Sequence, residues 1–419
     1  MIGRLQFFSK AAIVAVVMGF QLGVAFAQEG TIAGFSAARL AGMDSAIQAE
    51  VDKGRVAGLV VAVARDGQVV HNKAYGYADR EAGVGMTTEH LFRLYSMTKP
   101  ITSVALLTLY EDGLFQLSDP LDRYIPEFSD LKVFAGVDEN GNPILEVLDR
   151  KPTIHDAFRH TLGLTGGLGG HPVDAIYREH GIGMFSLDSL SDEIQRLGQV
   201  PLRYQPGDQW VYGLGHDVQA YLVEVFSGMP FAQYLQQELF GPLNMEDTLF
   251  GVPVSRAEDF ARVYQPNGEG GLQPEAEDRY TRFTDHHFAT LSLSSSTGDY
   301  LKFARMLLNG GELDGVRILG RKTVEFMAQN HLPGNIPSIN NGTGPSSTGY
   351  GLGVSVIIDT SALGRLDSVG SFGWSGAATT TFRVDPAENF VYVINAQTFP
   401  GDQDLLEKVQ NLIYQALVQ

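Results

Sequence analysis

The feature that most constrains this chain is the run of residues 94–110. Its second half is apolar enough to form a buried helix, and Glu111-Asp112-Gly113 follows it, with glycine where many helices place a left-handed terminal residue. We predict a helix that begins at about Ser96. Pro100 is compatible with this helix because the amides of a first helical turn have no partner within the helix.

A predicted start at Ser96 places its hydroxyl and the Lys99 amine one turn apart on the same helix face. Burial lowers the pKa of a lysine, and a neutral amine can accept the proton of a serine hydroxyl. The free amides of a helix N-terminus favour the negative charge that then develops. This pair is therefore a candidate for nucleophilic catalysis.

A Ser-x-x-Lys pair also occurs by chance, and Ser129 and Lys132 provide a second example. That pair stands among acidic and turn residues with no apolar helix behind it, so we interpret it as surface loop. Taken alone, the Ser96 pair is better explained as a helix cap with Lys99 pointing to water. Other segments of the chain are therefore needed to distinguish a catalytic pair from a helix cap.

Residues 1–27 have the pattern of a secretory signal peptide. Arg4 and Lys10 precede an apolar run that ends in Ala25-Phe26-Ala27, a small-x-small cleavage pattern. A retained membrane anchor is the alternative, and no later stretch is long and apolar enough to span a bilayer. We expect a periplasmic or secreted protein, with no stable membrane insertion of its mature form.

The composition narrows the chemistry further. The net charge is −18, and removing the two positive charges of residues 1–27 makes the rest more acidic. An acidic surface disfavours nucleic acid as a partner. The chain has no cysteine, which excludes disulfides, a cysteine nucleophile and thiolate metal sites. We expect no cofactor and no metal, and we leave the oligomeric state open.

Apolar runs and turn residues predict a sheet built from both ends of the chain. Residues 59–64 and 69–77 flank an Asp66-Gly67 hairpin turn, and the fold class we expect is α/β (α+β), with an antiparallel sheet flanked by helices plus a mainly helical domain. The sheet part covers about 36–95 and 300–419 and the helical part about 118–290, with the active site between them. The other predicted elements are a helix over 36–53, strands over 351–358, 379–384 and 390–396, and a helix over 404–417.

Two further segments carry residues that suit the same chemistry as Ser96. Tyr212 stands just ahead of an apolar helix, and Trp374-Ser375-Gly376-Ala377 leads into a strand. Together with Ser96-x-x-Lys99, their order resembles the serine β-lactamase and penicillin-recognising superfamily. Within it, the chain is most similar to the class C β-lactamase-like esterases, also called family VIII carboxylesterases. The resemblance covers nearly the whole chain after residue 58.

The resemblance implies a role for each of these residues. Ser96 would be the acylated nucleophile, Lys99 its proton acceptor and Tyr212 a proton shuttle to the leaving group. The backbone amides of Ser96 and Ala377 would form the oxyanion hole, and residues 374–376 would contact the substrate. The resemblance leaves open whether Lys99 or Tyr212 is the base during acylation.

The sequence departs from the superfamily at two positions. Leu214 stands where β-lactamases and peptidases carry an asparagine, and Trp374 stands where they carry lysine or histidine. An apolar, aromatic wall suits neutral esters better than anionic peptides or β-lactams. We therefore expect an esterase acting on a small-molecule ester with a short-chain or aryl group. The alternatives are a β-lactamase, a D-alanyl-D-alanine carboxypeptidase, or a non-catalytic binding protein of the same fold.

Each motif also has a purely structural interpretation. Tyr212 could pack beside Trp210, and Trp374 could be a core residue. The Gly-x-Ser-x-Ala patterns at 34–38 and 373–377 resemble a nucleophile elbow, but the βα alternation of that fold is absent. His286-His287 with Asp285 could suggest a metal, yet no third ligand pattern supports it and adjacent side chains diverge, so we interpret the histidine pair as structural or pocket-lining. The combination of three elements in order favours the Ser96 site.

Overall fold

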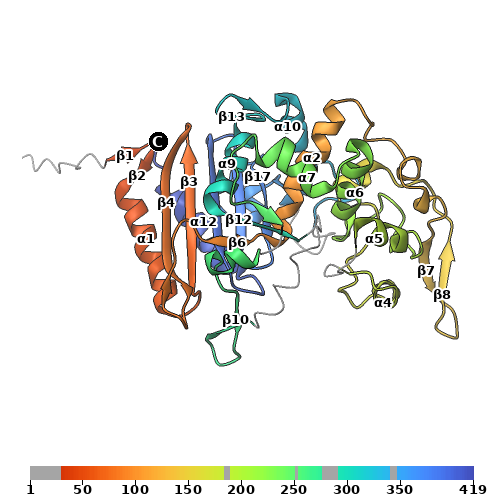
Figure 1. Ribbon diagram of the computed structural model, residues 1–419, viewed down its shortest axis with the longest axis horizontal. Helices are drawn as coiled ribbons and strands as arrows, with labels where there is room; N and C mark the ends of the chain where they lie inside the picture. The colour runs from red at the N-terminus through yellow and green to blue at the C-terminus, as the bar shows by residue number, and fades with distance from the viewer. Residues whose placement is uncertain (1–29, 184–188, 251–252, 276–290, 340–346) are drawn as a thin grey trace, which may run out of the picture.

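In this computed structural model, the described residues are 30–183, 189–250, 253–275, 291–339 and 347–419 (Figure 1). Within them, the central sheet has eight antiparallel strands in the order β15-β16-β17-β18-β19-β3-β4-β5. The C-terminal β19 pairs along its length with the N-terminal β3, so both chain ends build one sheet. The strands are β3 (Gly58–Arg65), β4 (Gln68–Asp79), β5 (Val84–Gly85), β15 (Thr348–Tyr350), β16 (Ser355–Ile357), β17 (Phe372–Gly376), β18 (Thr380–Asp385) and β19 (Phe390–Ala396).

Helices cover both faces of this sheet. Side chains of β3 alternate between the faces: Val61 and Val63 belong to the core under α1 and α12, whereas Ala62 and Ala64 belong to the core under α9. Burial of both faces explains why β3 is a continuous apolar run in the sequence. The helices that cover the faces are α1 (Ala37–Asp52), α9 (Thr297–Leu308) and α12 (Gln403–Ala416). Two shorter helices, α10 (Arg321–Met327) and α11 (Thr360–Leu363), lie in the same C-terminal part of the chain.

The middle of the chain forms a second, mainly helical region on the other side of α2, with the β7–β8 hairpin at its far end (Figure 1). Helix α2 packs against α6, and this contact joins the two regions. The helices of this part are α2 (Thr98–Glu111), α3 (Ile154–Phe158), α4 (Pro172–Glu179), α5 (Leu190–Leu197), α6 (Gly215–Ser227) and α7 (Phe231–Leu235), with helical turns η1 (Tyr95–Met97), η2 (Leu121–Arg123), η3 (Pro126–Phe128), η4 (Gln236–Phe240) and η5 (Val254–Asp259).

Short strands make up the remaining pairs. Strand β12 holds β6 on one side and β9 on the other, next to the start of α2. None of the helices in the described ranges is long and apolar enough to cross a membrane. The short strands are β1 (Thr31–Ile32), β2 (Phe35–Ser36), β6 (Leu91–Arg93), β7 (Val133–Val137), β8 (Pro143–Glu146), β9 (Leu249–Phe250), β10 (Tyr264–Pro266), β11 (Leu272–Pro274), β12 (Leu293–Ser296), β13 (Glu312–Leu313) and β14 (Val316–Arg317).

The expected fold class is confirmed, and the differences from the predicted elements have local causes. The helix expected to begin at Ser96 begins at Thr98, because residues 95–97 form a 3₁₀ turn ahead of it. Pro100 lies in the first turn of α2, and Gly113 follows the helix with a φ of 75°, as predicted.

Only part of the strand predicted over 351–358 is a strand: residues 351–354 form a tight turn, which joins β15 just before this range to β16 within it. The Gly351 amide donates to the Val354 carbonyl (2.7 Å), and Gly353 has a φ of 84°. A Cβ at Gly353 would lie 2.0 Å from the Ser103 hydroxyl, so the turn presses against α2 and only glycine fits. The apolar residues of this stretch are buried in the turn as well as in the strands, which made them look like one strand.

Candidate active site

Ser96 lies in the η1 turn, and the backbone there is held from several directions. Tyr95 has a φ of 47°, a left-handed conformation that is rare and strained for a bulky residue. The Leu94 amide donates to the Leu293 carbonyl of β12 (2.9 Å), and the Tyr300 hydroxyl of α9 donates to the Met97 carbonyl (2.8 Å). These contacts fix the strained turn and therefore the position of the Ser96 hydroxyl.

The structure brings Ser96, Lys99 and Tyr212 together, as the sequence predicts. The Tyr212 hydroxyl donates a hydrogen bond to Ser96 Oγ (2.6 Å), and Lys99 Nζ lies 3.3 Å from the same oxygen. Lys99 Nζ also lies 4.7 Å from the centre of the Tyr212 ring. Ser96 Oγ therefore has two proton-carrying groups within hydrogen-bond distance, as a nucleophile with a nearby base requires.

Burial makes Lys99 a usable base near neutral pH. Its side chain has no exposed surface, and desolvation lowers the pKa of its ammonium to about 7, against the opposing charge of Asp217. A substantial fraction is therefore neutral at pH 7. Burial acts in the other direction on Tyr212 and raises the pKa of its phenol well above the usual range. Tyr212 is thus a proton donor at neutral pH.

Tyr212 belongs to a group of six rings from four segments of the chain, which we call the aromatic cluster. His160 is central to it, with ring centres 4.8–5.5 Å from those of four other members. Burial and the Lys99 charge hold the pKa of His160 and of His216 well below the usual range, so both imidazoles are neutral. The members are His160, Trp210, Tyr212, His216, Tyr350 and Trp374.

Strand β17 brings its end close to the Ser96 turn. A Cβ at Gly376 would lie 2.2 Å from the Leu94 carbonyl oxygen, so the glycine allows β17 to lie close to the backbone that precedes Ser96. Ala377 follows directly and packs against a small apolar cluster that includes Tyr95. The Ser375 hydroxyl donates to Thr381 Oγ1 of β18 (2.9 Å). The amides of Ser96 and Ala377 thus belong to adjoining segments, and their oxyanion-hole role stays a prediction.

The two departures from the superfamily pattern have structural counterparts. Leu214 is 1% exposed and is part of the core at the start of α6. A Cβ at Gly213 would lie 2.5 Å from the Leu164 carbonyl oxygen, so this loop is tightly packed. Trp374 packs 5.9 Å from the Tyr212 ring and 5.2 Å from the Tyr350 ring. Where the superfamily has an amide and a cation, this chain has packed apolar and aromatic groups.

The alternative motifs lie elsewhere. Ser129 and Lys132 are both exposed, outside the core. Ser36 is buried and caps α1, where its hydroxyl accepts from the Arg39 amide. Residues 285–287, the Asp-His-His sequence, lie outside the described residues, and among the described ones no group of three or more His, Asp or Glu could hold a metal.

Sequence reasoning did not single out His160, His216, Asp217 or Tyr350 as parts of the site. His216 and Asp217 lie in the first turn of α6, where an acidic residue is usual and carries no functional signal. The one feature of the sequence that could have indicated their place in the site is their position just after Tyr212.

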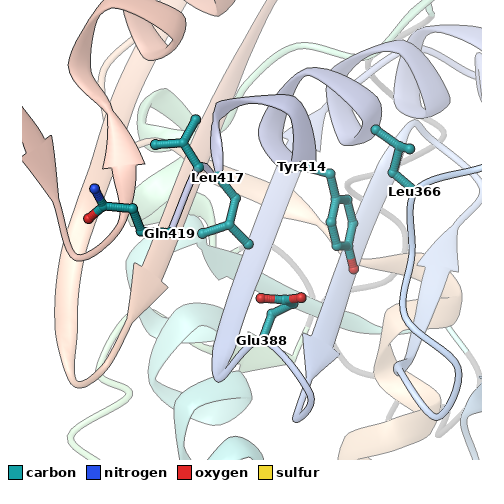
Figure 2. Close-up of a pocket in the computed structure, with 6 residues that line it drawn as sticks. Leu366, Glu388, Tyr414, Leu417 and Gln419 are labelled. Atoms are coloured by element: carbon teal, nitrogen blue, oxygen red, sulfur yellow. The ribbon is translucent and has the colours of Figure 1, made fainter. Parts of the chain in front are cut away.

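A separate cavity of about 380 Å³ lies at the C-terminal end of the chain (Figure 2). Tyr414 in its wall belongs to the core under α1 and α12, on the sheet face opposite α9. The cavity is therefore distinct from the Ser96 site. The residues around it are Leu366, Glu388, Tyr414, Leu417, Val418 and Gln419.

Comparisons with known proteins show the family and the fold of this chain. A family model described as Beta-lactamase matches residues 43–416. Esterase EstB of Burkholderia gladioli is 29% identical over 371 residues, covering 84% of this chain and 88% of EstB. Lovastatin esterase of Penicillium rubens is 28% identical over 399 residues, covering 87% of this chain and 94% of the esterase. The solved structure of EstCE1, a hydrolase with promiscuous acyltransferase activity, has a TM-score of 0.76 at 24% identity and covers 90% of this chain and 99% of that one.

Proposed function

Because this chain belongs to the β-lactamase family and is an esterase-type serine hydrolase, we propose that it is an exported carboxylesterase that cleaves short-chain or aryl esters through an acyl-enzyme on Ser96. The observation that carries the proposal is the meeting of Ser96 Oγ, Lys99 Nζ and the Tyr212 hydroxyl within hydrogen-bond distance.

The proposed acylation step uses each of these groups once. Neutral Lys99 accepts the Ser96 proton, and Ser96 Oγ forms a bond to the ester carbonyl carbon. The amides of Ser96 and Ala377 stabilise the resulting oxyanion. As the ester C–O bond breaks, the leaving oxygen takes a proton from Tyr212, and Tyr212 is reprotonated from the Lys99 ammonium. Water then releases the acid by the reverse sequence.

The aromatic cluster supports neutral esters as substrates. Its two histidines are uncharged, and none of its members is a lysine or arginine that could hold a substrate carboxylate. The cation beside it is Lys99, which the mechanism needs in its neutral form. A β-lactam or a peptide carboxylate would therefore lack a counter-charge among these residues.

We expect the mature protein to hydrolyse p-nitrophenyl esters of short acids and to turn over a chromogenic cephalosporin weakly or not at all. Trp374→Lys should raise KM for neutral esters by about 2- to 10-fold, because one aromatic contact of 0.5–1.5 kcal/mol is lost. Trp374→Phe, which keeps an aromatic wall, is the matched control and should change KM less. Cephalosporin turnover by the wild type at a rate comparable with its esterase rate would contradict the proposal.

Export is proposed from the N-terminal pattern of basic residues, apolar run and Ala25-Phe26-Ala27. In a bacterial host, the activity should be recovered from the periplasm or the medium. Mass spectrometry of the recovered chain should show that it begins at Gln28. Recovery in the cytoplasm with residues 1–27 intact would argue against export.

A further inference from the structure

Tyr212 stands on a segment with no regular structure. Residues 210–212 belong to neither a helix nor a strand, and α6 begins only at Gly215. The Tyr212 hydroxyl nevertheless has to lie within hydrogen-bond distance of Ser96 Oγ, and it does so at 2.6 Å. A displacement of about 1 Å in a reacting group can lower the rate by about 100-fold. Contacts from other parts of the chain must therefore fix this tyrosine.

His160, in the turn after α3, contacts this segment twice. Its backbone carbonyl accepts a hydrogen bond from the amide of Val211, the residue directly before Tyr212 (2.8 Å). Its ring centre lies 4.9 Å from that of Tyr212 and 5.5 Å from that of Trp210. Aromatic rings at this spacing attract each other. One residue of the helical region therefore holds both the backbone ahead of Tyr212 and the Tyr212 ring.

The backbone at His160 is itself held in a strained conformation. Its φ is 57°, in the left-handed region that few residues other than glycine adopt. On either side of it, the Arg159 guanidinium and the Thr161 hydroxyl both donate to the fully buried carboxylate of Asp156 (3.1 and 2.8 Å). Backbone strain persists only where the surroundings enforce it, and it is concentrated at functional sites. The chain thus keeps a strained backbone at the point where the His160 ring joins the aromatic cluster.

The His160 ring is a neutral packing group in this position. The residue is 2% exposed, and burial together with the Lys99 charge holds the pKa of the imidazole well below its usual range. Neither ring nitrogen has a hydrogen-bond partner among the described residues. The ring therefore does not act as a base or as a hydrogen-bond donor to Tyr212, and its burial leaves it little surface with which to touch a substrate.

We propose that His160 is a positioning residue of the esterase reaction, whose buried ring holds the Tyr212 hydroxyl where it can protonate the leaving oxygen. It acts through Tyr212 and transfers no proton of its own. The inference rests on the proposed function, in which Tyr212 donates that proton. It adds a support from the turn after α3 to the group formed by Ser96, Lys99 and Tyr212.

Two acetate esters isolate this role. Ethyl acetate and p-nitrophenyl acetate form the same acyl-enzyme, so the ratio of their kcat/KM values, which we call the ester ratio, reports the leaving group. The ethoxide leaving group needs a proton from Tyr212, whereas p-nitrophenolate needs little protonation. A misplaced Tyr212 should therefore slow ethyl acetate more than p-nitrophenyl acetate, and the loss should fall on kcat rather than on KM.

The test removes the His160 ring and then restores it. His160→Asn replaces the ring by a side chain that tolerates a left-handed backbone, and it should lower kcat/KM for ethyl acetate by about 10- to 100-fold. His160→Phe keeps a neutral ring, of the kind that Tyr95 already carries in a left-handed conformation, and should recover most of this loss. His155→Asn is the matched control and should leave the ester ratio unchanged, because the His155 ring of α3 contacts His331 outside the aromatic cluster.

A double variant shows whether His160 acts through Tyr212. In a Tyr212→Phe background no hydroxyl is left to position, so adding His160→Asn should change the ester ratio no further. Two effects that multiply in the double variant would be independent of each other, and this result would overturn the inference.

A folded His160→Asn protein with the wild-type ester ratio would overturn the inference while leaving the proposed function intact. If this variant does not fold by circular dichroism, His160→Leu, which fills the site without a ring, has to show the same loss. If neither ring-free variant folds, the ring serves the fold rather than Tyr212, and the inference is wrong. Absence of esterase activity in the wild type would instead refute the proposed function itself.

Discussion

Replacing Ser96 by alanine should lower kcat for p-nitrophenyl esters by at least about 10⁴-fold, the scale of losing a serine nucleophile. The Ser96 hydroxyl oxygen lies within hydrogen-bond distance of both the buried Lys99 amine and the Tyr212 phenol. The variant should also lose covalent labelling by a serine-directed phosphonate. Both losses follow because the acyl-enzyme has no other oxygen on which to form.

The second Ser-x-x-Lys pair provides the control for this experiment. Ser129 is exposed in the turn after η3, and its replacement by alanine should leave kcat and labelling unchanged. If the Ser96 variant keeps its rate, or if Ser129 proves essential, the nucleophile has been assigned to the wrong residue. Intact-protein mass spectrometry after phosphonate treatment reports the labelling directly.

Replacing Tyr212 by phenylalanine should reduce kcat for an alkyl ester by about 10²–10⁴-fold, the usual worth of general acid–base catalysis. The hydroxyl that donates to Ser96 Oγ at 2.6 Å is lost, while the ring that packs on Trp374 remains. KM should therefore change little, which is the pattern of an interaction made in the transition state.

Esters with different leaving groups distinguish the catalytic role of Tyr212 from that of Lys99. Esters with good leaving groups need less protonation, so the Tyr212→Phe variant should be less impaired on p-nitrophenyl esters than on alkyl esters. Lys99→Ala should slow both classes, because the Ser96 proton must be removed whatever leaves. A Tyr212→Phe enzyme within a few-fold of the wild-type kcat on an alkyl ester would show that Tyr212 only packs.

The sheet was largely predictable because its central strands are buried on both faces. The run at residues 59–64, the Asp66-Gly67 turn and the run at 390–396 carry strong local signals, and the structure places β3, a turn and β19 there. The 3₁₀ turn before α2 was not predictable in this way. It depends on contacts from Leu293 and Tyr300, which lie about two hundred residues further along the chain.

Within the site, residues that stand in recognisable short motifs were predicted, and residues without such a motif were missed. Ser96 and Lys99 are one helical turn apart, so their spacing carries the signal. His160 and Tyr350 meet at 5.3 Å only in the folded chain, and nothing in their spacing marks the pair. Asp217 was hidden by its position, since acids are common in a first helical turn for purely local reasons.

The pairing of β3 with β19 has a consequence for how this chain folds. Val61 pairs with Ile394, so nearly the whole polypeptide lies between two strands that must meet. Pairing two strands so far apart in sequence is slow, because the entropy of closing the intervening loop is lost before their native contacts form. The turn at Ser96 likewise relies on Tyr300 and on the close approach of Gly376. The nucleophile is therefore synthesised early and becomes positioned for reaction only after the last quarter of the chain has been made.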